Sequence, residues 1–426
     1  MSIASILFVS FVILLLFNVP IALGLGVSSV VAMIMAGLPL DMFPMQVYAN
    51  IGKFALLAIP FFILAGNTME RAGISEKLIN MANKFVGHKK GGLAIVGVIT
   101  SCFFAAISGS GPATVAALGV IIIPAMIKAR YPVGMSSALM ATAGSIGIII
   151  PPSIAFVVYG AIAGVSIGKI FIAGIIPGIL MGIALIIASL IMVKRMDIEE
   201  QEKASFEEKM KSVKEAFWGL MMPVIILGGI YGGYFTPTEA AAVSAVYGIL
   251  VGLFIYKTIT IKDLHQLMVQ SALGSAVVMF IVACAGFFAW FITTQGIAQM
   301  ASNILLNVAG NKYMFLFIIN IILLIAGCFI EANSALYIFV PIMLPVAVAL
   351  GYDPIALGVV MTVNLAIGQV TPPVGVNLYV ACGISKISLK EISKAAIPFI
   401  LASLVILILI TYIPEIILFL PKFMKL

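Results

Sequence analysis

A segment broken by glycine and proline inside a long apolar run most constrains how this chain can fold. GSIGIIIPPS, Gly144 to Ser153, holds glycines and two adjacent prolines. Each proline lacks an N–H and its ring clashes with the preceding turn, so the helix is interrupted and carbonyls upstream lose their partners. In a lipid environment such carbonyls are costly unless something binds them. The sequence therefore predicts a helix break whose exposed backbone has a ligand.

A second segment of the same kind, GQVTPPVG, Gly368 to Gly375, lies 221 residues later. The register between the two halves holds without a gap. The matched pairs are Pro124/Pro345, Tyr131/Tyr352, Met140/Met361, Gly147/Gly368, Pro151/Pro372, Pro152/Pro373, Lys169/Lys390 and Pro177/Pro398. Paired Gly/Pro interruptions in two halves of a membrane protein are the best sequence pointer to a transporter's binding site.

Composition assigns the chain to the membrane. Of its 426 residues, 63% are hydrophobic and 9% are charged, whereas soluble proteins have roughly a quarter charged. We expect an all-α polytopic membrane protein that forms one membrane domain. The net charge of +7 does not indicate nucleic acid, because the basic residues stand at the ends of apolar segments, where membrane topology explains them.

The chain begins with apolar segments that predict a helical hairpin and a crossing, followed by a surface helix. Residues 5–17 and 21–37 are apolar and indicate a tight helical hairpin, with one long kinked helix as the alternative. Residues 38–50 are expected to be a loop, and residues 54–69 a crossing. Residues 73–87 are amphipathic, which predicts a helix lying along the membrane surface.

The centre of the first half is predicted to be re-entrant. Residues 91–126 are apolar but interrupted by SGSGPAT, 108–114, and both flanks are basic. Turn chemistry in the middle and basic residues at both ends indicate a hairpin that enters and leaves on one side. A broken helix at 131–164 and a crossing at 170–193 follow. The polar stretch 194–215 is expected to be a surface helix that joins the two halves.

The second half repeats this plan. The expected elements are a helix pair at 217–234 and 239–256, a crossing at 264–291, a surface helix at 296–310, a hairpin at 313–350 broken around Glu331 to Ser334, a broken helix at 354–382 and a crossing at 395–412. Each half then has five transmembrane helices and one re-entrant helical hairpin.

An odd number of crossings inverts the second half relative to the first. Eighteen of the Lys and Arg residues fall on one predicted face and five on the other, which identifies the cytoplasmic side and leaves the N-terminus periplasmic. The broken helices and hairpin tips should meet at the midplane. The predicted domains are 1–193 (crossings and surface helix 1–90, hairpin and broken helix 91–169), the linker 194–215, and 216–426 (crossings and surface helix 216–312, hairpin and broken helix 313–385).

Backbone and hydroxyl oxygens at the tips and breaks suit a hard cation, and half-helix N-termini suit a carboxylate. The candidate Na⁺ ligands are Ser108, Ser110, Gly111, Thr114, Gly144, Gly147, Ile150, Ala332, Asn333, Gly368 and Thr371. The candidate substrate ligands are Ser108, Ser145, Pro151, Ser334, Gln369 and Pro372. The alternative is that these small residues only permit close helix packing, but packing does not require paired prolines.

Charged residues near the predicted sites are few. Glu331 is the carboxylate near a midplane tip, so a cation ligand or proton site is the default hypothesis, although its repeat mate is Ser110. The arginines, Arg71, Arg130 and Arg195, fall at the cytoplasmic boundary. An anionic substrate would therefore need helix N-termini, hydroxyl groups and bound cations to offset its charge.

Through SGSGPATVAALG, GSIGIIIPPS, EANSAL and GQVTPPVGVNLY, the chain resembles the large membrane subunit of TRAP (tripartite ATP-independent periplasmic) transporters, within the wider ion-transporter superfamily. The resemblance covers essentially the whole length. It implies an elevator-type carrier of the bacterial inner membrane, not an enzyme, in which the hairpins and broken helices move against a static framework, residues 1–90 and 216–312. It implies uptake of carboxylate-bearing solutes, such as C4-dicarboxylates or sialic acid, with Na⁺ as the coupling ion and no other cofactor.

The resemblance also implies partners: a separate small four-helix membrane subunit, a periplasmic substrate-binding protein, membrane lipid and a small anionic substrate. Two other classes stay open. An antiporter or channel-like carrier could use the same fold without a binding protein. A purely structural subunit could also share it, but would not need two matched helix breaks.

Overall fold

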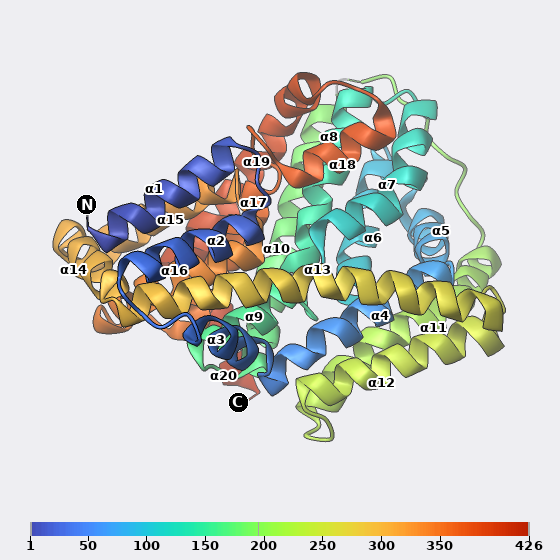
Figure 1. Ribbon diagram of the computed structural model, residues 1–426. Helices are drawn as coiled ribbons and strands as arrows, with labels where there is room; N and C mark the ends of the chain where they lie inside the picture. The colour runs from blue at the N-terminus through green and yellow to red at the C-terminus, as the bar shows by residue number, and fades with distance from the viewer. Residues whose placement is uncertain (1, 195, 425–426) are drawn as a thin grey trace.

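The computed structural model describes residues 2–194 and 196–424, and every regular element within those ranges is a helix (Figure 1). This confirms the predicted all-α class. Eight of the described helices are long and apolar enough to cross a membrane by length and composition. Arg195 and the ends of the predicted domains, Met1 and Leu426, lie outside the described residues.

The chain starts with α1 (Ile3–Leu16) and α2 (Ile21–Met35), which pack against each other. They form the predicted hairpin rather than one kinked helix, and Asn18, at φ 62°, lies in the turn. The expected loop at 38–50 is wrong, because α3 spans Met42–Ile51. Pro44 in that segment falls in the first turn of α3, where a missing N–H costs no helical hydrogen bond.

The rest of the first half follows the predicted order. It consists of the 3-10 turn η1 (Phe54–Leu57), α4 (Ala58–Arg71), α5 (Ile74–Val86), the hairpin α6 (Gly92–Ser108) and α7 (Gly111–Lys128), the broken helix α8 (Val133–Ser145), η2 (Ile146–Ile148) and α9 (Ile154–Ala163), and α10 (Ile167–Val193).

The linker differs from the prediction of a separate surface helix. Residues 196–204 are not helical, and α11 begins at Phe206 and runs without a break to Tyr231. Ser205 and Glu208 form a capping box that fixes this start, since each supplies a partner for a free backbone N–H. Arg130 Nε contacts Glu199 Oε1 at 2.9 Å and so ties the non-helical part to the end of α7.

The second half contains the same series of elements. It consists of α11, α12 (Pro237–Leu250) with a π-helical turn η3 (Val251–Ile255), α13 (Ile261–Thr294), α14 (Ile297–Ala309), the hairpin α15 (Lys312–Gly327) and α16 (Ala332–Ala349), the broken helix α17 (Pro354–Gly368) and α18 (Val376–Ser385), and α19 (Leu389–Tyr412). A short helix not predicted from the sequence, α20 (Glu415–Phe423), ends the described chain.

The two halves make reciprocal contacts. Helix α12 packs on α4, as α2 packs on α13, and α18 packs on α7, as α9 packs on α16. The surface helices α5 and α14 each follow a left-handed glycine, Gly73 at φ 74° and Gly296 at φ 69°. Because each half-helix after a break lies on the hairpin of the other half, the site region is built from both repeats.

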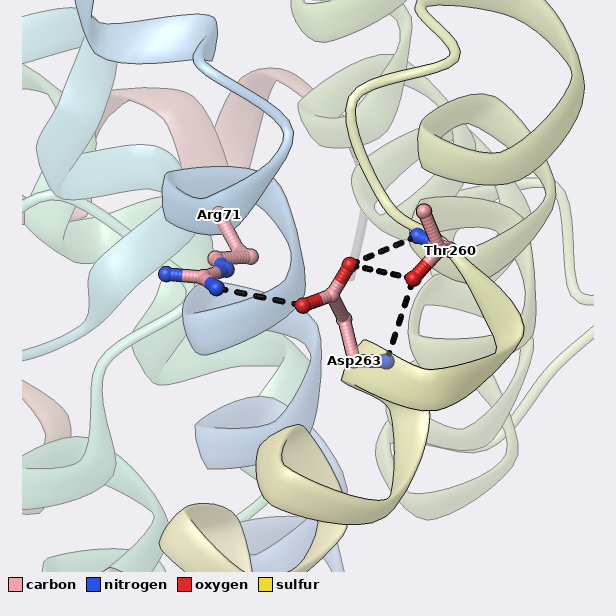
Figure 2. Close-up of polar contacts among 3 residues, drawn as sticks. All are labelled: Arg71, Thr260 and Asp263. Atoms are coloured by element: carbon pink, nitrogen blue, oxygen red, sulfur yellow. Dashed lines mark hydrogen bonds and ion pairs between the residues drawn. The ribbon is translucent and has the colours of Figure 1, made fainter.

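Helix α13 organises the framework. Its 34 residues give a length of about 51 Å at about 1.5 Å per residue, and Figure 1 shows it running the width of the molecule past α2, α3 and α4. Its start is joined to the end of α4. Arg71 Nη2 donates to Asp263 Oδ1 at 3.3 Å, and Asp263 Oδ2 accepts from Thr260 N and Oγ1 at 2.9 and 2.6 Å (Figure 2).

Candidate functional site

One cavity of about 220 Å³ lies where the hairpin tips and helix breaks of both halves meet. Val277, Val278 and Ile281 of α13 close one side of it. The remaining lining residues are Gly109, Ser110, Pro112, Ile148, Ile154, Ala155, Glu331, Ala332, Asn333, Gln369 and Val376. We call this space the central cavity.

Hydroxyl and carbonyl oxygens gather at the tip of the first hairpin. Ser108 Oγ lies 3.1 Å from Thr114 Oγ1, and Ser110 O accepts from both hydroxyls, at 3.0 and 2.8 Å. Ser108 and Thr114 are buried. Three oxygens of this kind in one buried group are the ligand type that a hard cation takes.

The first helix break packs directly on the tip of the first hairpin, because the residues of the break at this contact are glycines. A Cβ atom at Gly147 would lie 2.6 Å from Ser110 O, and one at Gly144 would lie 3.2 Å from Gly111 O. The predicted cation ligands Ser108, Ser110, Gly111, Thr114, Gly144 and Gly147 are thus neighbours. Ile150 lies further along the break, with its side chain against Gly178.

Glu331 caps the second hairpin tip. Its Oε2 accepts from Asn333 N at 2.9 Å and Ser334 N at 3.3 Å, and its Oε1 accepts from Asn333 Nδ2 at 2.7 Å. Both carboxylate oxygens therefore serve the N-terminus of α16, where a negative charge is also favoured by the helix dipole. The structure shows that Glu331 is a helix cap, and its role as a cation ligand or proton site stays a prediction.

The N-termini of α7 and α18 lie at the central cavity. Ser110 makes no side-chain capping bond to α7 within the described chain, and Gly375 before α18 has no side chain to cap with, although Asn377 N donates to Gln369 O. Ser110, Pro112 and Val376, at those two N-termini, line the central cavity. Two partial positive charges of helix dipoles consequently border it.

The second break approaches its own hairpin through two glycines. A Cβ atom at Gly368 would lie 2.5 Å from Gly327 Cα, at the end of α15. Thr371 Oγ1 donates to Ile367 O at 2.8 Å. Asn333 Oδ1 and Ser334 Oγ are buried and lack a hydrogen-bond partner among the residues described. The hydroxyl oxygens of the first tip are hydrogen-bonded within that tip. In the second tip, Asn333 Oδ1 and Ser334 Oγ are free to contact a ligand.

Three predicted substrate ligands lie elsewhere. Ser145 is buried in α8 and donates to Thr142 O at 2.7 Å. Pro151 lines a separate apolar crevice of about 620 Å³ between α6, α10 and α11. Pro372 is exposed and is not among the residues that line the central cavity. A proline break redirects the chain, so its ring need not face the space that its neighbours line.

Several residues of this region were not predicted from the sequence. Asn377, in the first turn of α18, is fully buried beside Gln369, and Gly327 meets Gly368. Asn67 and Glu70 of α4 line a second cavity of about 210 Å³ next to Ser108 and Ser110. An amide four residues after the second proline pair, in otherwise apolar sequence, is the signal that could have identified Asn377.

Comparison with known proteins agrees with this geometry. The family model described as the tripartite ATP-independent periplasmic transporter, DctM component, matches residues 8–416. The C4-dicarboxylate TRAP transporter large permease protein DctM of Rhodobacter capsulatus is 40% identical over 98% of this chain and 99% of its own length. The isethionate TRAP transporter permease protein DctMQ of Oleidesulfovibrio alaskensis is 43% identical over 96% of this chain and 65% of its own.

A relative with a third kind of cargo in its name is the sialic acid TRAP transporter large permease protein SiaM of Vibrio cholerae, 38% identical over 88% of both chains. Among solved structures, the YdaH transporter of Alcanivorax borkumensis superposes with a TM-score of 0.63 at 14% identity, over 87% of this chain and 88% of that one. At that identity the likeness concerns the fold alone, and it supports the membrane-transporter architecture described above.

Proposed function

The chain belongs to the family of the DctM component of tripartite ATP-independent periplasmic transporters, and from that premise we propose that it drives uptake of a small organic anion with a sodium gradient. It is a multi-pass membrane permease and not an enzyme. The proposed cargo bears a carboxylate, of the C4-dicarboxylate or sialic acid type. The proposed location is the bacterial inner membrane, with the N-terminus periplasmic.

The observation that carries this proposal is the central cavity between the two halves. Two helix N-termini without a side-chain cap border it, at Ser110 and Val376, and the one carboxyl group in its lining within the described chain, Glu331, is engaged as the cap of α16. Helix dipoles supply only about half a charge each. Since no Lys or Arg lines the cavity within the described chain, we propose that bound Na⁺ ions supply the rest of the positive charge.

The proposed Na⁺ sites join each tip to a break. The first site uses Ser108, Ser110, Thr114 and the backbone at Gly147. The hydroxyl oxygens of Ser108 and Thr114 and the carbonyl oxygen of Ser110 already lie within 3.1 Å of one another. The second uses the backbone at Gly368 with Thr371. Ser334 Oγ is buried without a hydrogen-bond partner in the described chain, and we assign this hydroxyl and the amide N–H groups of Gln369, which can donate to a carboxylate, to the substrate. Asn333 Oδ1 is also without a partner there, and because it is an acceptor we assign it to a cation.

Motion and partners complete the proposal. The hairpins and broken helices, with α10 and α19 packed on them, move as one body against a framework of α1 to α5 and α11 to α14. The chain works with a separate small four-helix membrane subunit and a periplasmic binding protein, within membrane lipid. A carrier that bypasses a binding protein is the competing function.

Reconstitution tests the proposal. The chain and its small subunit are placed in liposomes, the binding protein is added outside, and uptake of the solute that this binding protein holds is followed with Na⁺ or K⁺ outside. The expected result is uptake only when both Na⁺ and binding protein are present. Equal uptake without the binding protein would support the antiporter or channel-like alternative.

A further inference from the structure

Two buried amide side chains of the second helix break face the tip of the first hairpin. Gln369 follows α17 and Asn377 lies in the first turn of α18, and Asn377 N donates to Gln369 O at 3.0 Å. Their side chains are 4% and 0% exposed. Gly111 stands opposite: a Cβ there would lie 3.2 Å from both Asn377 Oδ1 and Asn377 Nδ2 and would clash with Gln369 Oε1. Both amide oxygens therefore lie beside Gly111.

Neither amide oxygen has a hydrogen-bond donor in the described part of the chain. The orientation of Asn377 is determined by its Nδ2, which donates to Ala141 O at 3.2 Å. Turning that amide over would bring two acceptors together, so Oδ1 is the atom left without a donor. A buried acceptor without a donor is unfavourable, and two such acceptors beside one glycine can share one positively charged partner.

The repeat shows that packing alone does not require these amides. At the register of 221 residues, Gly111, Gln369 and Asn377 correspond to Ala332, Ile148 and Phe156. The contact between α18 and α7 is matched by the contact between α9 and α16. The equivalent positions in the other half are thus occupied by an alanine, an isoleucine and a phenylalanine, so polar residues occur at these positions in only one of the two halves.

We propose that Gln369 Oε1 and Asn377 Oδ1 bind a monovalent hard cation, Na⁺ as the probe, beside Gly111. The ligands are neutral amide oxygens, whereas Ca²⁺ and Mg²⁺ sites rely on carboxylates. This site is additional to the two tip-and-break sites and has no counterpart in the other half. This inference rests on the proposed function, because the site would give that transport cycle a third Na⁺ ion, which is bound in only one of the two halves.

The position of the site links the ion to the substrate. Gln369 also lines the central cavity, so an ion held on its oxygen lies next to the anion that the cavity receives. The ion adds positive charge to the uncapped N-terminus of α7, where Ser110 and Pro112 border the same space. Binding of the ion and of the anion should therefore be mutually favourable.

The test is equilibrium binding of radioactive sodium to the purified full chain in lipid nanodiscs. The site variants are Gln369→Ile, which copies the repeat mate, and Asn377→Leu. The matched control is Asn364→Leu, because Asn364 is also a buried amide with a free Oδ1 but lies in α17 and bonds to Asn320. We expect each site variant to bind one sodium ion fewer per chain than the parent, and the control to keep the parent number.

The Gln369→Glu variant distinguishes loss of the ion site from misfolding, because it is expected to strengthen sodium binding. It keeps the side-chain shape and adds a negative charge to the proposed ligand, so sodium should bind about tenfold more tightly. Parent stoichiometry in Gln369→Ile and Asn377→Leu, with parent affinity in Gln369→Glu, would overturn the inference and assign the amides to a water molecule. A parent chain that binds no sodium would instead overturn the sodium coupling of the proposed function.

Discussion

Gly147, in the break of the first half, lies so close to Thr114 in the first hairpin that a Cβ atom at position 147 would stand 2.7 Å from Thr114 Oγ1. The other half has a comparable approach between Gly368 and Gly327. Each break is thus held against its own hairpin by the absence of a side chain. Gly147 and Gly368 are matched in the repeat for a steric reason, because a side chain at either position would obstruct the contact between the hairpin and the break.

The first prediction follows from this contact. Gly147→Ala places a methyl group against Ser110 O and Thr114 Oγ1, and overpacking of this kind costs about 1–3 kcal/mol. The half-saturating sodium concentration for uptake should therefore rise. The control is Gly228→Ala, because nothing lies within 4 Å of a Cβ at Gly228. Identical sodium titrations for the two variants would contradict a cation site between this tip and this break.

A second prediction concerns the other break. Thr371→Val removes a hydroxyl that now donates to Ile367 O and keeps the shape of the side chain. We expect weaker sodium dependence of uptake, because the hydroxyl oxygen is one of the proposed ligands. If the variant in proteoliposomes keeps the sodium dependence of the parent, Thr371 serves packing only.

The third prediction separates two roles of Glu331. If the carboxylate acts as a cap, Glu331→Asn should keep transport and sodium dependence, because Asn is a favourable N-cap residue. Glu331→Ala should lower the free energy of unfolding by about 0.5–2 kcal/mol, measured as a lower midpoint of thermal unfolding. Loss of sodium dependence in the Asn variant, with its thermal midpoint unchanged, would restore Glu331 as an ion ligand.

The sequence predicts the large features here because they leave strong local signals. Paired prolines at 151 and 372 and turn residues at 108–114 located the breaks and a tip. The role of Glu331 was not predictable in this way, since a carboxylate in an apolar run is compatible with an ion ligand or a cap until its neighbours are known. Helix α3 was missed because its ten residues include a proline and give a weak helical pattern.

Contacts across the repeat were the least predictable part. The register pairs each residue with its mate in the other half, whereas Gly111 meets Gln369 and Asn377, which are the mates of Ile148 and Phe156. Such contacts depend on how the two halves interlock.

The fourth prediction concerns the moving body. Gly168 of α10 faces Ile230 of α11, with 3.3 Å between a Cβ at Gly168 and Ile230 Cγ2. A disulfide in Gly168→Cys/Ile230→Cys should stop transport, and a reductant should restore it, because it ties the moving body to the framework. The control is Gly26→Cys, which would pair with Cys284 inside the framework, 3.1 Å from its Sγ. Full transport with the first cross-link formed would exclude an elevator motion.

The most direct test of sodium coupling is uptake under an imposed membrane potential. Bound sodium ions must outnumber the charge of a monoanionic substrate if they offset it and also drive it, and each net charge moved gains about 2.3 kcal/mol per 100 mV. Proteoliposomes containing the chain, its small subunit and the binding protein are given a sodium gradient with and without an inside-negative potential. We expect the potential to accelerate uptake. Uptake that is indifferent to the potential and persists with sodium absent on both sides would contradict the coupling scheme.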